Sequence, residues 1–271
     1  SIAGSVSKVA TGVAATADEG TVVMSDVVQR IVGHRFETES IGNQKLRGVA
    51  RPVEVFSVEA EATADLEDDQ RRLTPITGRE YELGVLQNCW QGAQSGTGQT
   101  VLVCADAGVG KTRLIGTFRE QISATESKTL IGRCSAYHEN SAFYAVGGLL
   151  AGLLDHEAGS AERTVRRLEA LADDLELPRQ EAIPLVADVL SMGTPEGYQP
   201  FVGTPELRKQ KTIETLLDLL LGISDEEPVL LLIEDLHWSD ASTIELIGRL
   251  VDEVASTSTL IVLTYRPNFT P

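Results

Sequence analysis

The sequence predicts an α/β fold with a mostly parallel sheet in its larger, C-terminal part. Residues 101–104 form an apolar run that is followed by a small-residue loop and then by a helical pattern. A longer apolar run at 229–233 is followed by two acids, and another lies at 259–265. Unbroken apolar runs separated by helical patterns are typical of buried parallel strands. We therefore expect a three-layer sandwich with helices on both faces of the sheet.

The loop after the first of these strands has the spacing of a phosphate-binding P-loop. VLVCADAGVGKTRL, residues 101–114, matches G-x-x-x-x-G-K-S/T with Ala105 in the first glycine position, which alanine tolerates if its φ is negative. The alternative is a plain glycine-rich turn, which the strand before and the helix after it disfavour. Loop glycines let successive backbone N–H groups face phosphate oxygens, and the helix adds its positive N-terminus. The predicted nucleotide contacts are Ala107, Gly108, Val109, Gly110, Lys111, Thr112 and Arg113, with Lys111 on the β and γ phosphates and Thr112 on Mg²⁺.

Two acids follow the apolar strand 229–234. Glu234 and Asp235 lie at its C-terminal end, where open α/β sheets bind their ligands. One acid would hold Mg²⁺ or its water, and the other would position the attacking water. Together with Thr112 they form the predicted metal site.

The last strand ends in a second candidate for phosphate contact. Thr264 or Arg266 could sense the γ-phosphate, and Arg266 is favoured because a guanidinium binds phosphate in a bidentate manner. An exposed arginine without a function is the equal alternative for Arg266. For His237 and Trp238, which follow the acids, packing at the strand–helix corner is favoured over catalysis.

Composition limits the functions that the chain can have. It has 271 residues and a formal net charge of −17, which argues against nucleic-acid binding because phosphate contacts need clustered Lys and Arg. No apolar run is long enough to span a membrane. The three cysteines, Cys89, Cys104 and Cys134, have neither disulfide nor zinc spacing. The histidines His34, His138 and His156 have no metal-ligand spacing. We therefore expect reduced thiols and a cytoplasmic protein without a zinc site.

Residues 1–58 are predicted to form a separate α+β unit. A helical face with Val13 precedes a strand at 21–24, a short helix at 26–32 and strands at 36–41 and after Pro52. Residues 59–73 are acidic and are predicted to be an extended linker. Because the chain starts at Ser1 and not at Met, we expect it to be part of a longer protein.

Residues 74–271 are predicted to form the second unit. A helix opens at 78–80 and runs to about Trp90, before the P-loop strand. Strands at 128–134, 229–234 and 259–265 should lie parallel to the P-loop strand, which is expected at the centre of the sheet. Further helices are predicted at 143–154, 161–174, 179–191, after Thr204-Pro205, and after Asp240.

This second unit resembles the P-loop ATPase domain of the AAA and STAND signal-transduction class. The resemblance rests on TGREYEL, the P-loop, GRCSAYHEN, LLLIEDLHWSD and LIVLTYRPN. It implies that Gly78 and Arg79 lie near the adenine and that Arg266 is a sensor. It also implies a regulator that switches between closed and open, often oligomeric, forms. Family members continue with a further strand and a lid, which this chain, ending at Pro271, is expected to lack.

The first unit resembles the C-terminal end of class III nucleotidyl cyclase domains, through the helix, DEGTVVMSD and LRGVARPVEVFSV. The resemblance implies an asparagine and an arginine that stabilise the transition state, and these positions hold Lys8 and Gly12. We therefore expect a catalytically silent, partial cyclase-like lobe.

The function expected from both units is an ATP-binding regulatory module that uses Mg·ATP binding and slow hydrolysis as a switch. Its partners would be ATP or ADP, other domains of a longer chain and possible further copies in a homo-oligomer. The alternatives are a nucleotidyl cyclase making cyclic AMP under control of the ATPase unit, and a nucleotide-binding scaffold without hydrolysis.

Overall fold

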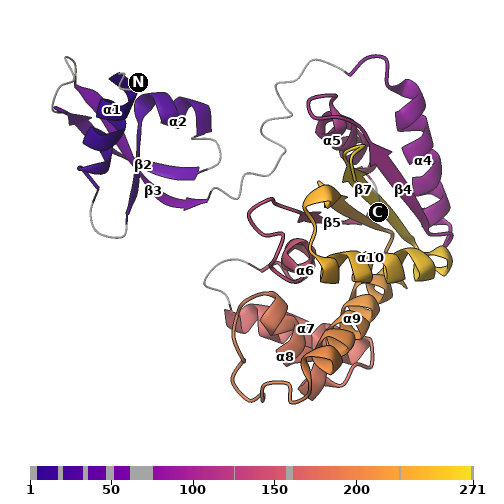
Figure 1. The fold of residues 1–271 in the computed structure, drawn as a ribbon. Coiled ribbons are helices and arrows are strands. Elements are labelled where there is room, and N and C mark those ends of the chain that lie inside the picture. The colour runs from indigo at the N-terminus through magenta and orange to yellow at the C-terminus, as the bar shows by residue number, and fades with distance from the viewer. Residues whose placement is uncertain are drawn as a thin grey trace. The chain divides into compact units, whose positions relative to one another are not determined.

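The computed structural model describes residues 5–17, 21–32, 36–46, 52–61, 76–124, 126–156, 161–225 and 227–269. The chain divides into two compact units, Ser1–Thr74 and Pro75–Pro271, whose elements are labelled in Figure 1. Each unit has its own sheet and its own hydrophobic core.

The first unit contains an antiparallel three-stranded sheet in the order β1-β3-β2. In chain order its elements are α1 (Ser5–Ala14), β1 (Val22–Ser25), α2 (Asp26–Val32), β2 (Phe36–Gln44) and β3 (Val53–Glu61). The order of helices and strands is the predicted one, but β3 corrects a boundary. Residues 59–61 belong to β3 and not to the predicted linker, and Ala60 and Glu61 pair with the start of β2. The rest of that linker, like His34, lies outside the described residues.

The helix α1 packs closely against the segment that follows β2. Val13, Leu46 and Val55 form the buried core of this unit. A Cβ atom built on Gly12 would lie 3.0 Å from the Cβ of Leu46. Position 12 is therefore filled by a neighbouring leucine, and a larger side chain there requires Leu46 to move. Lys8 lies in α1 as well, but its side chain is outside the described part.

The second unit is built on a parallel sheet of four strands within the described residues. They are β4 (Gln99–Cys104), β5 (Lys128–Arg133), β6 (Val229–Glu234) and β7 (Thr259–Tyr265). Their order is β4-β7-β6-β5. The parallel α/β fold is confirmed, but the prediction of a central P-loop strand is wrong, because β4 lies at the edge of this sheet.

The strand order follows the apolar content of the strands. Every residue of β6 is buried, and so is every residue of β7 before Tyr265. β4 and β5 each begin with two partly exposed residues, and Leu102 in β4 is 51% exposed. Strands covered on both faces and both edges need unbroken apolar sequence, whereas edge strands do not. The sheet therefore places its two most apolar strands in the middle.

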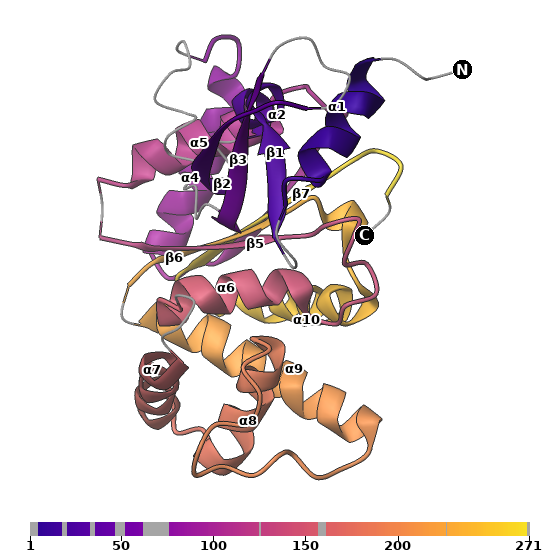
Figure 2. The same ribbon diagram turned by 90° about the vertical axis from the view of Figure 1, so that its left-hand side faces the viewer.

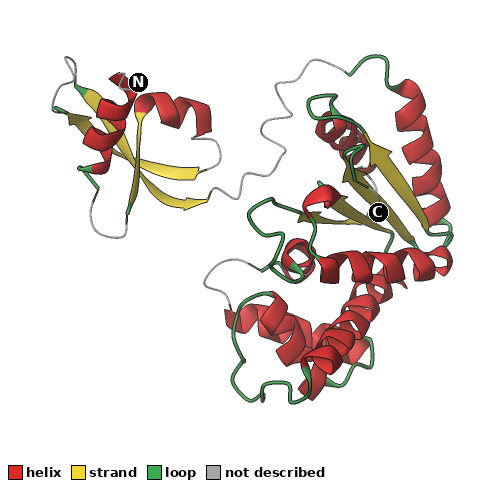
Figure 3. Cartoon of the chain, viewed as in Figure 1, coloured by secondary structure: helices red, strands yellow, loops and turns green. Residues whose placement is uncertain are grey.

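Helices cover both faces of the sheet (Figures 2 and 3). On one face α4 (Glu80–Gln94) and α5 (Lys111–Ile122) pack against Leu230 and Leu232 of β6. On the other face α6 (Tyr144–Leu154) and α10 (Ala241–Glu253) pack against Leu231 and Ile233. Successive strand residues alternate between these two cores, as the pleat of a strand requires.

Three helices form a group beside the second face: α7 (Ala161–Asp174), α8 (Arg179–Val189) and α9 (Pro205–Gly222). Figure 2 shows them together, with α9 running towards α10. The predicted start of α9 is confirmed, since the Thr204 hydroxyl accepts a hydrogen bond of 3.2 Å from the N–H of Leu207. Asp240 caps α10 in the same way through the N–H groups of Ser242 and Thr243.

Candidate nucleotide-binding site

The loop between β4 and α5 has the backbone that a phosphate-binding loop needs. Gly108 and Gly110 have φ angles of 78° and 94°, in the left-handed region that favours glycine. A Cβ atom at either position would meet nothing within 4 Å, so conformation and not space selects glycine there. Ala105 is not among the residues with positive φ, which explains why alanine is tolerated. Residues 106–110 are all exposed.

Lys111, the first residue of α5, lies back across this loop. Its Nζ donates hydrogen bonds to the carbonyl oxygens of Ala105 at 2.6 Å and of Asp106 at 3.1 Å. Both partners are neutral, so neither cancels the charge of the ammonium group, which remains available to phosphate oxygens. The next residue, Thr112, is exposed at the helix N-terminus. These side chains fit a nucleotide phosphate and the Mg²⁺ ion that accompanies it.

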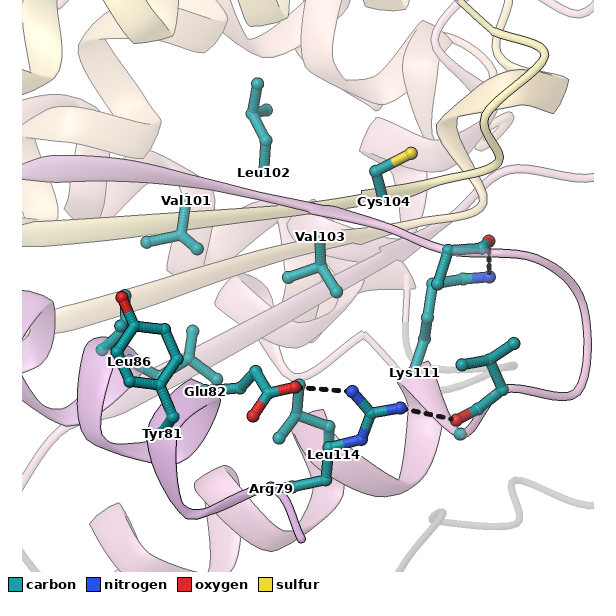
Figure 4. A pocket seen from close by; sticks show the side chains of 14 residues that line it. Arg79, Tyr81, Glu82, Leu86, Val101, Leu102, Val103, Cys104, Lys111 and Leu114 are labelled. Carbon is teal, nitrogen blue, oxygen red and sulfur yellow. Dashed lines mark hydrogen bonds and ion pairs between the residues drawn. The ribbon is translucent and has the colours of Figure 1, made fainter.

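Arg79 connects the start of α4 with the P-loop. Its guanidinium donates to the carbonyl oxygen of Val109 at 3.5 Å and pairs with the Glu82 carboxylate (Figure 4). The hydrogen bond from Arg79 holds the pKa of Glu82 below its usual value. Gly78, just before it, has a φ of 72°. The structure therefore brings Arg79 to the P-loop, and its partner Glu82 was not foreseen from the sequence.

A cavity of about 410 Å³ lies between α4, β4 and the P-loop. Figure 4 shows Val101 and Val103 on one side of β4, facing α4, whereas Leu102 and Cys104 lie on the opposite side. Arg79, Tyr81, Glu82 and Lys111 contribute its polar side chains. Apolar walls with a few polar groups at one end are typical of small-molecule sites.

Glu234, the last residue of β6, is on the same side of the sheet as the P-loop helix. It follows Leu230 and Leu232 in the strand alternation, and both of these pack against the α4–α5 face. Its side chain is buried and accepts a hydrogen bond of 2.9 Å from the Nε of Arg133. Arg133 is paired with Glu234 in the β5–β6 register, so the ion pair joins two neighbouring strand ends. Sequence reasoning did not single out Arg133; its position at a strand end is the available signal.

Asp235 differs from Glu234 in backbone and in exposure. Its φ is 55°, so the chain leaves the strand at this residue and the alternation of side chains stops. Its N–H donates to the Oγ1 of Thr264 at 3.0 Å, and its side chain is 50% exposed. Thr264 thus holds the backbone of Asp235, which gives it a structural contact not foreseen from the sequence. The two acids are adjacent in sequence, but only Asp235 has an exposed carboxylate.

Two further polar groups lie near Asp235. The Nε of Arg266 and both ring nitrogens of His237 are buried without a hydrogen-bond partner in the described part of the chain. Burial lowers the pKa of His237; the Asp235 carboxylate opposes this shift, and the positive charges of Arg266 and Lys111 add to it. Buried polar atoms are nearly always paired, so unpaired ones next to a P-loop fit a site that a polar ligand completes.

The predicted site residues therefore divide into two sets. The P-loop residues 107–113 and Arg79 lie around the cavity and the start of α5, and Gly78 directly precedes Arg79. Glu234, Asp235 and Arg266 lie at the C-terminal ends of β6 and β7. No group of three or more His, Cys, Asp or Glu side chains among the described residues is arranged to hold a metal ion. Mg²⁺ at this edge would therefore depend on phosphate oxygens as well as on Thr112 and the acids.

No helix in the described residues is both long enough and apolar enough to cross a membrane.

The chain is 26% identical over 253 residues to an uncharacterized protein of Rhizobium meliloti (strain 1021), covering 92% of this chain and 24% of that protein. It is 25% identical over 276 residues to a protein of Brucella abortus biovar 1 named beta-(1→2)glucan export ATP-binding/permease protein NdvA, covering 92% of this chain and 44% of that one. The chain thus spans less than half the length of either relative.

The family is shown by a different comparison. A sequence model described as the AAA ATPase domain matches residues 75–263, which are most of the second unit and more than half of the chain. The matched region includes the P-loop, the acids Glu234 and Asp235 and the first five residues of β7. The chain belongs to the AAA ATPase domain family.

Proposed function

We propose that this chain is an ATP-binding regulatory module in which Mg·ATP binding and slow hydrolysis act as a conformational switch. The observation that carries the proposal is the position of Lys111 and Thr112 at the start of α5, on the same side of the sheet as Glu234. This arrangement supports the proposal, because the proposed phosphate-binding residues and the proposed metal-binding acid lie at the carboxyl ends of parallel strands, where such folds bind ligands.

ATP is the proposed nucleotide for two reasons. The relatives from Brucella carry ATP-binding in their names, and the family is an ATPase family. The cavity beside Arg79 adjoins the P-loop and offers apolar walls to a flat base. When bound, Mg²⁺ would neutralise phosphate charge. Lys111 would hold the β and γ phosphates, Asp235 would orient the attacking water, and Arg266 would contact the γ-phosphate.

A scaffold that binds nucleotide without hydrolysis is the second candidate. The Arg133–Glu234 ion pair favours it, because it engages the acid that hydrolysis needs for metal. The proposed switch requires this pair to open when Mg·ATP binds. Arg133 is 52% exposed in its side chain, so it is free to turn towards solvent or phosphate. The cyclase alternative is not favoured, because position 12 is packed against Leu46.

The test of nucleotide binding compares melting temperatures of the whole chain with and without Mg·ATP. At ~100 times Kd the ligand should stabilise the second unit by about 2.7 kcal/mol. This corresponds to an increase of roughly 5–10 °C for a domain of this size. Lys111→Ala should abolish the shift. Lys209→Ala is the matched control, because Lys209 lies on α9 and pairs with Glu245; it should keep the shift. Equal shifts in wild type and Lys111→Ala would contradict the assignment.

A further inference from the structure

His237 lies in the short 3-10 turn Leu236–Trp238 that follows β6 and Asp235. Its side chain is only 6% exposed, yet neither ring nitrogen has a hydrogen-bond partner among the described residues. A residue that served only as packing at this corner would not need an imidazole, because an apolar side chain leaves no polar atom unpaired. The two unpaired nitrogens therefore require an explanation.

The Asp235 carboxylate lies close to the imidazole ring of His237. The Nδ1 of His237 is 3.9 Å from the Oδ1 of Asp235, too far for a hydrogen bond. The Asp235 carboxylate is half exposed, whereas its backbone is held by Thr264. The imidazole is thus enclosed by the protein, whereas the carboxylate is half exposed and is not enclosed. A change of the Asp235 rotamer is the movement needed to bring the two groups together.

We propose that His237 is a positioning residue for ATP hydrolysis, whose Nδ1–H binds the Asp235 carboxylate when Mg·nucleotide is present and fixes its orientation towards the attacking water. This inference rests on the proposed function. Hydrogen bonds between catalytic groups are often long in ligand-free structures and shorten when substrate binds. A base that is itself oriented by a third group is a recurring arrangement in enzymes.

The first experiment uses two variants of nearly equal shape in the full chain, His237→Asn and His237→Leu. The Asn side chain keeps a donor near the Nδ1 position, and the Leu side chain has none. His237→Leu should lower the rate of phosphate release ~10–100-fold with an unchanged Kd for ATP, which is the usual range for an orienting partner. His237→Asn should restore most of the rate. Equal rates in the two variants, or a normal rate in His237→Leu, would overturn the proposal.

A double-mutant cycle tests whether His237 acts through Asp235. In an Asp235→Asn background, His237→Leu should cause no further loss of turnover, because the carboxylate to be oriented is already absent. Independent, multiplying losses would show that His237 acts by another route and would overturn the proposal.

A spectroscopic measurement decides the matter even if turnover is too slow to follow. The chain has four histidines, so ¹⁵N-histidine NMR is simple, and His237→Asn assigns the signals of His237. Mg²⁺ with a non-hydrolysable ATP analogue should produce a hydrogen-bonded Nδ1–H at His237, and Asp235→Ala should remove it. Unchanged His237 signals while the analogue binds would overturn only this inference. Failure of the wild-type chain to bind the analogue would overturn the proposed function and this role together.

Discussion

The two units of this chain treat their motif positions in opposite ways. In the first unit the helix position that the cyclase resemblance singles out holds Gly12, which is packed against Leu46. In the second unit the strand end that the ATPase resemblance singles out keeps acids, with Asp235 half exposed. The comparison shows how packing decides whether a position can hold a polar group. Charged side chains reach the surface where the strands of the second unit end, whereas the close approach of Leu46 fills the space beside position 12.

The size of the cores separates the units as well. Among its described residues the first unit has four buried hydrophobic side chains around a three-stranded sheet: Val13, Met24, Leu46 and Val55. The second unit buries both faces of a parallel sheet under separate sets of helices. Because stability grows with buried apolar area, the second unit has far more interior to support an exposed, polar edge.

The largest expected effect is on ATP turnover, and it concerns the two acids at the end of β6, Glu234 and Asp235. Asp235→Asn should keep ATP affinity and reduce phosphate release by ~10²–10⁴, because a neutral amide cannot take up a proton or polarise water. Glu234→Gln should weaken the Mg²⁺ dependence of ATP binding and, with it, the ATP affinity. Both variants are measured by ATP affinity and phosphate release. Normal turnover in Asp235→Asn, with binding but no turnover in Glu234→Gln, would mean that the roles are exchanged.

The next largest effect is a loss of stability, and it compares the hydrophobic cores of the two units. Leu232→Ala and Leu46→Ala should each destabilise their own unit by about 2–5 kcal/mol, the usual loss for a buried leucine. Calorimetry of the whole chain should resolve which transition each variant lowers. Mg·ATP should raise the transition that Leu232→Ala lowers and leave the other one unchanged. A single transition that responds to both substitutions and to nucleotide would show that the units unfold together.

A smaller effect is expected from placing at position 12 the arginine that the cyclase resemblance implies. Gly12→Arg should destabilise the first unit by about 1–3 kcal/mol, because the new side chain displaces Leu46. It should not produce cyclic AMP from ATP. The stability is measured by calorimetry and the product by chromatography. Cyclic AMP formation by Gly12→Arg, but not by the wild type, would contradict this expectation.

The smallest expected effect is on stability and tests the N-terminal cap of α9 in the second unit. Thr204→Ala should destabilise this unit by about 1 kcal/mol, because the first turn of α9 loses the acceptor for the N–H of Leu207. Thr204→Ser keeps that acceptor and should be nearly neutral. Chemical denaturation of both variants measures the difference. Equal stability of Thr204→Ala and the wild type would show that the Thr204 cap does not stabilise α9.

Much of the chain was determined by local sequence. The glycines of the P-loop require a left-handed backbone, Thr204-Pro205 starts a helix, and the apolar run of β6 predicts a buried strand, each through interactions within a few residues. The backbone of the loop before α5 and the end of a buried strand at Glu234 were therefore predictable by residue number.

The tertiary structure alone decided the strand order, the partners and the backbone of the acids. Parallel strands are joined by long crossovers, so the sequence does not state which strands are neighbours, and β4 was wrongly expected at the centre. The Arg133–Glu234 pair joins residues that are far apart in the chain, and the positive φ of Asp235 is held by Thr264 of another strand. Such contacts form only once the sheet has assembled, because their distances depend on the packing of whole elements and not on local preference.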